Sequence, residues 1–233
     1  MKNKVLLLNH LERKGFEEVY RYLVNYSNWD MKNIFIAETP EWDKFRKLPY
    51  RYLPPAFRQG KKLNRLAIAA HESGHTIAMT ATYGVVDKAV IDVKDHPEGW
   101  LGFVAPRRQK DASDRQPIVQ GMLCTPIIKI DILTDAAGFV GESLVGKMTG
   151  SYHEKFLVYC RCRYLDDQEG SEPLTNWVHY VDWCKSIILS NKYLFWRVTD
   201  DLLAHSEMTE SIKALLYSSI KKEKPNCFFN QEN

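Results

Sequence analysis

Hydrophobic residues recur every three or four positions along most of this chain, the spacing that lines one face of an α-helix. The strongest pattern covers residues 63–83, where small apolar residues form a continuous stripe. The same periodicity predicts further helices at residues 2–26, 117–145, 154–165, 174–189, 192–205 and 208–221. We therefore expect a mainly helical protein whose later helices form a C-terminal bundle.

Alternating hydrophobic and polar positions interrupt the helical pattern near the middle of the chain. Residues 85–93 alternate as a half-buried strand does, and a second strand is predicted at residues 100–104, after a turn at residues 95–99. A shorter strand-like run covers residues 34–37. The expected fold class is therefore α+β, predominantly α-helical, with a small β-hairpin whose second strand lies at an edge.

Prolines and basic residues separate the first part of the chain from the rest. Residues 38–62 are rich in proline and contain the basic run Arg58–Lys62, a composition typical of a linker. We therefore expect an N-terminal helix-strand extension and linker (residues 1–62), a main domain (residues 63–221) and a polar tail (residues 222–233). Three roles stay open for the extension: a pro-like segment that shields a cleft, an arm that recognises a partner, or extra elements of the core.

Composition narrows the classes of function. The 233 residues are 45% hydrophobic and 26% charged, which suits one globular domain with a short appendage, and the net charge of +3 gives no reason to expect a nucleic-acid partner. The apolar run at residues 5–8 is far shorter than the roughly 20 residues of a membrane-spanning helix, so we expect no membrane span. The cysteines are odd in number and unevenly spaced, which favours free thiols in a reducing, cytoplasmic compartment.

The segment His71-Glu72-Ser73-Gly74-His75 matches the pattern H-E-x-x-H and lies inside the strongest predicted helix. Residues four apart project from the same side of an α-helix, so both imidazoles can reach one metal ion. We therefore expect His71 and His75 to bind one Zn²⁺ per chain. Glu72 lies beside the pair and can act as the general base toward a water molecule that zinc activates. The motif thus indicates a zinc-dependent peptidase, and Gly74 leaves room for another element to approach.

A hydrolytic zinc site usually has three protein ligands and an open fourth position. Residues 78 and 81 are alanines, which excludes the longer metzincin motif because that motif needs glycine and histidine there. Spacing does not choose among the acidic residues and histidines farther along the chain. The candidates for the third ligand are His96, Asp131, Asp135, Glu142, His153 and Glu154.

Several segments, in this order, resemble the peptidase domain of the FtsH family, the M41 zinc metallopeptidases that are normally fused to an AAA+ ATPase. They are the H-E-x-x-H helix, the strands and turn at residues 90–106, the Ala136–Gly146 helix, the stretch Thr149–Glu154 and the helical pair at residues 202–216. Ala136–Gly146 is similar to the family's G-R-A-A-E-E-L-x-x-G helix, and Thr149–Glu154 falls where the family has T-G-A-S-N-D. The resemblance spans about residues 63–219.

The resemblance implies a role for each residue that matches a family motif. His71 and His75 would be ligands and Glu72 the general base, as the motif itself indicates. Glu154 falls on the aspartate of T-G-A-S-N-D and would be the third zinc ligand. Glutamate is one methylene longer than aspartate but still offers a carboxylate oxygen to zinc. Its neighbour His153 is the alternative third ligand.

Two further roles follow from the resemblance alone. Glu142 falls on the first glutamate of the family's A-E-E, which implies that it supports the site rather than binding the metal. The edge strand, with Trp100, Leu101, Gly102 and Phe103, would bind an extended polypeptide substrate by adding it to the sheet as a further strand.

The chain also departs from the family. No G-x-x-x-x-G-K-[ST] motif occurs in it, so we expect no ATPase module within these residues. A peptidase without a motor should cut unfolded or flexible segments, or depend on a separate ATPase or adaptor. Two other functions stay open: a catalytically silent zinc-containing module that binds peptides, and a regulatory protease specific for one partner protein. Retention of Glu72 disfavours the silent module, because structural zinc needs no general base.

Overall fold

A computed structural model of the chain describes residues 7–26, 44–45, 64–82, 86–94, 101–106, 127–146 and 151–219. The helices are α1 (His10–Tyr26), α6 (Arg65–Thr82), α7 (Ile127–Leu144), α8 (Tyr152–Glu169), α9 (Thr175–Ser190), α10 (Lys192–His205) and α11 (Glu210–Ser219). The strands β1 (Val86–Ile91) and β2 (Gly102–Pro106) form an antiparallel pair. The predicted fold class, predominantly helical α+β with a small hairpin, is thus confirmed for the described residues.

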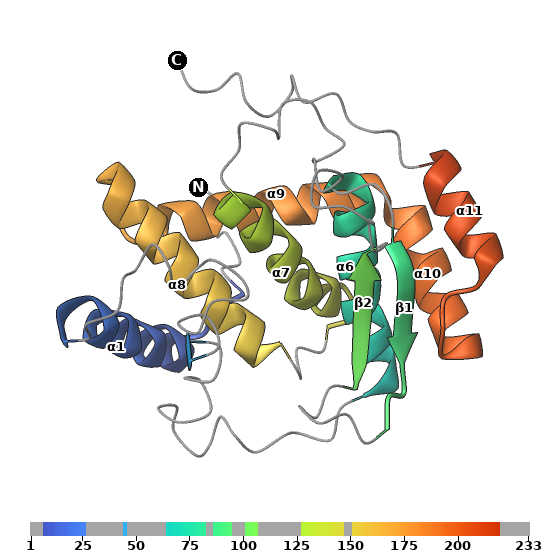
Figure 1. Ribbon diagram of the computed structural model, residues 1–233, viewed down its shortest axis with the longest axis horizontal. Coiled ribbons are helices and arrows are strands. Elements are labelled where there is room, and N and C mark those ends of the chain that lie inside the picture. The colour runs from blue at the N-terminus through green and yellow to red at the C-terminus, as the bar shows by residue number, and fades with distance from the viewer. Residues whose placement is uncertain are drawn as a thin grey trace.

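Helix α6 lies at the centre of the fold, packed against α7 and α10, and the two strands cover a further side of it (Figure 1). Most of its side chains are therefore buried, polar ones included. The hydroxyls return to carbonyl groups one turn earlier: Ser73 Oγ donates to the Ala69 carbonyl at 2.7 Å, and Thr76 Oγ1 donates to the Glu72 carbonyl at 2.8 Å. These hydroxyls can be buried because their hydrogen bonds are made within the helix.

Small residues allow α6 and α7 to touch backbone to backbone. A Cβ atom on Gly74 would lie 2.1 Å from the Ala137 carbonyl oxygen, and one on Gly141 would lie 2.3 Å from the Ala70 carbonyl oxygen. Both positions therefore require glycine for steric reasons. The close approach of α7 at Gly74 confirms the expectation that this glycine admits a neighbouring element.

Strand β1 is paired on both of its edges. On one edge it pairs with β2, with Ile91 opposite Gly102. On the other edge it bonds to the segment between α10 and α11: the Ile91 amide donates to the Ser206 carbonyl at 2.8 Å, and the Met208 amide donates to the Ala89 carbonyl at 2.9 Å. Strand β2 has β1 on one side only, and no described strand pairs with its outer edge.

Helices α7, α8 and α9 share an aromatic core beside α6. Trp177 of α9 stacks on Phe139 of α7, with ring centroids 5.5 Å apart and ring planes 3° apart. The ring of Tyr159 on α8 lies 6.3 Å from that of Trp177. This cluster fixes α8 relative to the helix pair α6–α7.

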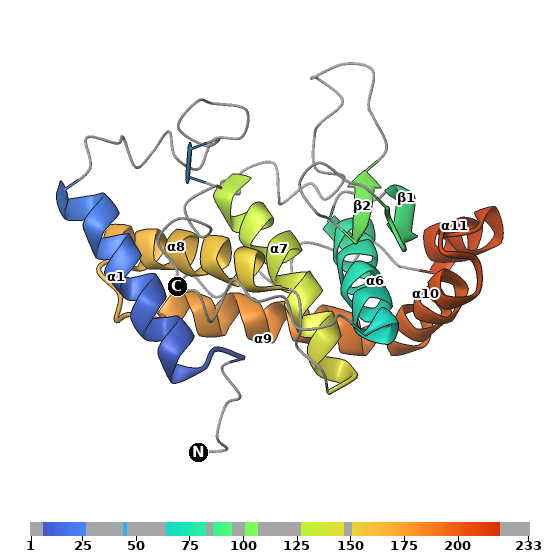
Figure 2. The same ribbon diagram turned by 90° about the horizontal axis from the view of Figure 1, so that it is seen from below.

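Helix α1 packs along α8, on the far side of the molecule from α10 and α11 (Figure 2). Phe16 of α1 is fully buried, and its ring centroid lies 5.2 Å from Tyr152, 5.5 Å from Phe156 and 5.6 Å from Tyr159. Helix α1 therefore shares buried aromatic contacts with α8.

Within the described residues, the observed boundaries differ most from the predicted ones at α8. The pattern predicts a helix over residues 154–165, whereas α8 runs from Tyr152 to Glu169. Its charged residues Arg161, Arg163 and Asp166 are buried among the surrounding helices, which interrupts the periodicity of the hydrophobic positions. The predicted strand at residues 34–37 and the polar tail from residue 222 lie outside the described residues, and of the predicted linker only residues 44–45 are described.

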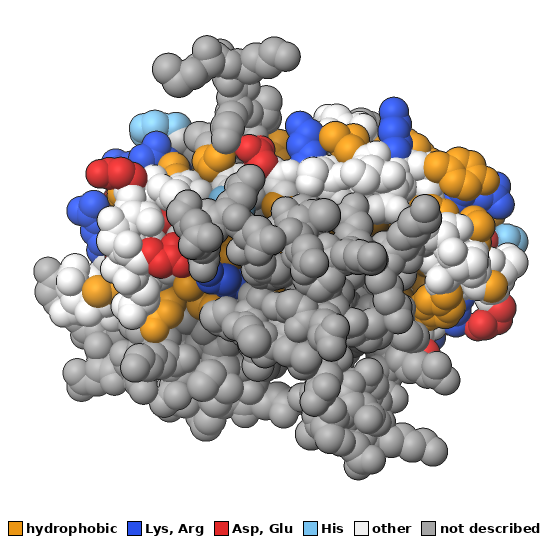
Figure 3. All heavy atoms as spheres, turned by 90° about the horizontal axis from the view of Figure 1, so that it is seen from above, with side chains coloured by type: hydrophobic (Ala, Val, Ile, Leu, Met, Phe, Trp, Pro, Cys, Tyr) orange, Lys and Arg blue, Asp and Glu red, His pale blue; other side chains and the backbone are white. Residues whose placement is uncertain are grey.

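The described surface mixes charge with apolar groups. On the face shown in Figure 3, Lys and Arg side chains are interspersed with Asp, Glu and hydrophobic side chains. No helix in the described part of the chain is long and apolar enough to cross a membrane.

Candidate metal centre

His71 and His75 lie one turn apart on α6, and their Nε2 atoms are 3.0 Å from each other. Glu154, in the first turn of α8, places its Oε1 atom 3.1 Å from each of these nitrogens. The three atoms thus form a nearly equilateral triangle. This group could hold a metal ion. The structure therefore brings together two residues of the motif and the third ligand that the family resemblance implies.

The outer nitrogens of both rings are held by groups that accept hydrogen bonds. His75 Nδ1 lies 2.8 Å from the Thr134 carbonyl oxygen, and His71 Nδ1 lies 2.7 Å from Glu142 Oε1. A carbonyl or carboxylate oxygen only accepts, so each neutral ring carries its proton at Nδ1 and presents a lone pair at Nε2. Two nitrogen lone pairs and a carboxylate oxygen then meet with no proton between them. Such an arrangement attracts a cation to its centre, either a metal ion or a proton.

The geometry and the donor set fit zinc. Ligands about 2.0–2.1 Å from a tetrahedral zinc ion lie about 3.3–3.4 Å from one another. The observed separations of 3.0–3.1 Å are a few tenths of an ångström shorter. The second oxygen of Glu154, Oε2, is buried and has no hydrogen-bond partner among the described residues. It is therefore available to bind a metal ion or to accept a hydrogen bond from another ligand of that ion.

Gly138 of α7 lies directly against the ligand atoms. A Cβ atom at this position would be 2.5 Å from His71 Cε1 and 2.6 Å from the Nε2 atoms of both His71 and His75. Any side chain there would occupy the space next to the ligand triangle. The helix that supplies Thr134 and Glu142 to the outer nitrogens thus also leaves this space open through Gly138.

Glu72 lies between the ligand group and the sheet. It is 5% exposed, and a Cβ atom on Gly102 would lie 2.5 Å from its Oε1 atom, so its carboxylate rests against the first residue of β2. His71 and His75 are close enough to influence its ionisation. The predicted general base is therefore adjacent both to the ligands and to the edge strand.

Burial and charge act in opposite directions on the titrating groups of the site. Burial is the largest single influence and lowers the pKa of His71 and His75, but the surrounding carboxylates, Glu154 foremost, together raise it more, so the pKa of each imidazole lies above its ordinary value. Burial raises the pKa of Glu154, but the two imidazoles lower it more, and the pKa of this carboxyl falls well below its usual range. For Glu72, burial dominates and raises the pKa. The site therefore favours a positive charge at the centre of the triangle.

Most other candidates for the third ligand lie elsewhere. Asp131 and Asp135 of α7 form ion pairs with Arg161 of α8. Burial raises the pKa of Asp131 to about 6, with Arg161 opposing that shift. The Glu142 carboxylate contacts the outer nitrogen of His71, Nδ1, which is the supporting position that the resemblance implies.

The remaining alternatives are the two other histidines. His153 precedes Glu154 on α8 but does not join the ligand group. His96 lies outside the described residues. Among the described candidates, Glu154 is thus the residue that completes the group.

Three of the four residues predicted to bind substrate lie on or next to β2. Gly102 begins the strand, Phe103 follows it, and Leu101 precedes it with 39% of its surface exposed. The Lys88 ammonium of β1 lies 5.9 Å from the centre of the Phe103 ring. Trp100 lies outside the described residues.

Two supporting residues were not anticipated from the sequence. Gly138 could have been suspected, because a glycine inside a strong helical pattern often marks a close packing contact. Thr134 contributes through its backbone carbonyl, which any residue carries, so no sequence signal identifies it.

No protein-family model and no curated protein matches the chain. The resemblance to the FtsH-family peptidase domain therefore rests on the motif residues themselves. The ligand group is a separate, geometric observation.

Proposed function

We propose that this chain is a zinc-dependent metalloendopeptidase that resembles the FtsH peptidase domain and hydrolyses peptide bonds in unfolded or flexible polypeptide segments. One observation carries the proposal: two imidazole lone pairs and the Glu154 carboxylate converge at 3.0–3.1 Å, with Glu72 beside them. Two histidines and one carboxylate are a donor set typical of zinc peptidases.

The metal ion and Glu72 would have different roles in hydrolysis. Zinc, when bound, would activate a water molecule and polarise the scissile carbonyl group. Glu72 would accept the proton of the attacking water and deliver it to the amine that leaves. Its buried position supports this role, because a raised pKa brings a carboxylate closer to the range in which a general base works well near neutral pH.

The edge strand β2 is the proposed binding site for substrate. An extended peptide would add to its outer edge through main-chain hydrogen bonds, which gives binding that depends little on side chains. Because Gly102 rests against Glu72, a peptide on this edge would lie close to the general base. We further propose a reducing, cytoplasmic location, since the described cysteines Cys160, Cys162 and Cys184 are buried free thiols. A separate ATPase or adaptor could supply unfolded substrate.

The first test is zinc content per chain, measured by elemental analysis. We expect one zinc in the wild-type protein and a sharp loss in Glu154→Ala. The matched control is Glu169→Ala, the same change at the other end of α8, where the carboxylate bonds to Asn176 at 2.9 Å. Equal zinc content in all three proteins would place the metal elsewhere, and absence of zinc from wild type would refute the proposal.

The second test separates catalysis from binding. With an unfolded protein as substrate, Glu72→Gln should keep its zinc but lose hydrolysis by at least about 100-fold, because the ligands remain while the general base is gone. A Gln variant as active as wild type would contradict the role of Glu72. Zinc-loaded wild type that binds unfolded protein without cutting it would favour the silent peptide-binding module.

A further inference from the structure

Near its start, helix α8 contacts other helices on two of its sides. One side carries Glu154 to the histidines of α6. The other side is held by α1, through Tyr152 and Phe156, which lie two residues before and after Glu154, and through Lys155 directly after it. The third ligand thus stands on a helical turn from which Tyr152, Lys155 and Phe156 contact α1.

The contact at this end of α8 combines charge with aromatic packing. Lys155 Nζ lies 3.3 Å from Glu12 Oε1, and both side chains are almost completely buried. The ring of Phe16 fills the space between Tyr152 and Phe156. A buried ion pair of this kind fixes the relative position of its two helices, because separating the charges leaves each of them unpaired in a poorly solvated place.

The first turn of α8 lacks the usual support from a helix cap. Its N-cap residue, Ser151, makes no side-chain hydrogen bond to the free amide groups of that turn. Such a bond normally contributes to the order of a helix start. The position of Glu154 therefore depends on tertiary contacts, and α1 supplies those on the side opposite the histidines.

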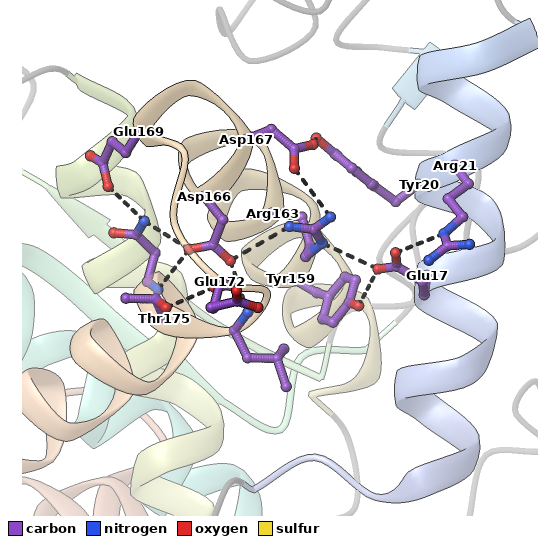
Figure 4. Close-up of polar contacts among 12 residues, drawn as sticks. Glu17, Tyr20, Arg21, Tyr159, Arg163, Asp166, Asp167, Glu169, Glu172 and Thr175 are labelled. Atoms are coloured by element: carbon purple, nitrogen blue, oxygen red, sulfur yellow. Dashed lines mark hydrogen bonds and ion pairs between the residues drawn. The ribbon is translucent and has the colours of Figure 1, made fainter.

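The remainder of the α1–α8 contact lies farther along both helices (Figure 4). Glu17 accepts hydrogen bonds from Tyr159 at 2.6 Å and from Arg163 at 3.2 Å, and Tyr20 donates to Asp167 at 2.6 Å. This far end also holds α1 on α8, with Tyr159 and Arg163 five and nine residues beyond Glu154, about 7.5 Å and 13 Å along an α-helix. The chain thus offers near and far contacts of similar chemistry on the same pair of helices.

We propose that Glu12, Phe16 and Lys155 are positioning residues for the third metal ligand, so that docking of α1 at the start of α8 sets the zinc affinity of the site. The inference rests on the proposed zinc centre and adds to it a role for the N-terminal helix. Helix α1 then acts neither as a shield over the cleft nor as a recognition arm, but as the support of the ligand-bearing turn.

The test compares one substitution at two places. Glu12→Gln removes a charge at the near end, while Gln still offers an oxygen to the Asn9 amide that Glu12 caps at 3.0 Å. Glu17→Gln makes the same change at the far end. Zinc dissociation constants are measured on the full chain by competition with a chromophoric chelator, beside the thermal stability of the metal-free proteins.

We expect Glu12→Gln to weaken zinc binding by about 10-fold or more, the effect of losing a contact that orients a ligand. Glu17→Gln should lower the melting temperature of the metal-free protein but leave zinc affinity unchanged. The double variant Glu12→Gln/Lys155→Met removes both charges and should restore much of the zinc affinity, because no buried charge is left unpaired.

The outcomes separate this inference from the proposed function. If wild type binds zinc and Glu154→Ala does not, the metal centre stands, and equal zinc affinities of Glu12→Gln and Glu17→Gln then overturn the positioning role. If wild type binds no zinc, both proposals fail. If Glu12→Gln does not fold, hydrogen exchange of wild type decides: zinc should slow exchange more at residues 12–16 than at residues 20–26, since coupling between two sites is reciprocal. Equal slowing would overturn the inference.

Discussion

Replacing Gly138 by alanine should separate metal binding from folding. The added Cβ atom would lie 2.5–2.6 Å from three ring atoms of His71 and His75. Comfortable contacts of carbon with neighbouring heavy atoms are about 3.5–4.0 Å, so the overlap is about 1 Å. The imidazole rings can rotate away from the added atom. Their Nε2 atoms then no longer converge with Glu154, and the hydrogen bonds of their Nδ1 atoms are broken.

The free-energy terms for the metal-free protein partly cancel. Overpacking of this size costs about 1–3 kcal/mol, whereas alanine is favoured over glycine inside a helix by about 1 kcal/mol. The metal-free Gly138→Ala protein should therefore lose only about 0–2 kcal/mol of unfolding free energy. Loss of one supporting contact lowers metal affinity by about 10- to 100-fold. Zinc affinity of Gly138→Ala should fall by more than about 100-fold, because two ligands are displaced together.

Gly141→Ala provides the matched control, one turn farther along α7. Its Cβ atom would meet the Ala70 carbonyl oxygen at 2.3 Å and the Gly74 Cα atom at 3.3 Å, both of them backbone atoms of α6. Backbone cannot rotate aside, so α6 and α7 must separate and stability should fall further than in Gly138→Ala. Urea unfolding of the metal-free proteins and chelator competition for zinc measure the two effects. Wild-type zinc affinity in Gly138→Ala would refute the assigned site.

Two further predictions concern the surroundings of the site. Glu142→Gln keeps an oxygen for His71 Nδ1 but removes the charge, so zinc affinity should fall by about 10-fold when measured by the same competition, and unchanged affinity would count against a supporting role. Asp131→Asn tests a pH effect: the folded pKa of about 6 lies above the ordinary 3.8, so this carboxyl favours folding below about pH 4 and loses that contribution as pH rises through 6. Between pH 4.5 and pH 7.5 the unfolding free energy of the Asn variant, relative to that of wild type, should rise by about 1–3 kcal/mol in urea unfolding. Removal of the ion pair with Arg161 offsets part of this gain. A difference between the two proteins that does not change with pH would contradict the raised pKa.

The sequence by itself determined the local half of the candidate metal centre. Helical periodicity placed residues 63–83 on a helix, and the spacing of His71 and His75 placed both imidazoles on one side of it. These are consequences of 3.6 residues per turn and need no information about the rest of the chain. The alternation at residues 85–93 likewise predicted the hairpin, since side chains of a strand alternate between its faces.

The third ligand could not be read from spacing, because Glu154 is 79 residues from His75 along the chain. Six residues were chemically acceptable, and only a family resemblance favoured Glu154. Packing of α8 against α7 brings this carboxylate to the histidines, whereas the same packing pairs Asp131 and Asp135 with Arg161. Residues with the same carboxylate chemistry thus acquire different partners, depending on which helices pack around them.

The tertiary structure alone decided which groups support the ligands. A backbone carbonyl at Thr134 and the absent side chain of Gly138 carry no chemical signature in a sequence. The buried pair Glu12–Lys155 joins residues 143 positions apart, and it explains why charged residues occur on a helix that is enclosed on several sides. Local periodicity reports which face of a helix is apolar, but partners of buried charges depend on how distant helices meet. The sequence therefore specified the motif, and the packing of α1, α7 and α8 around it specified the site.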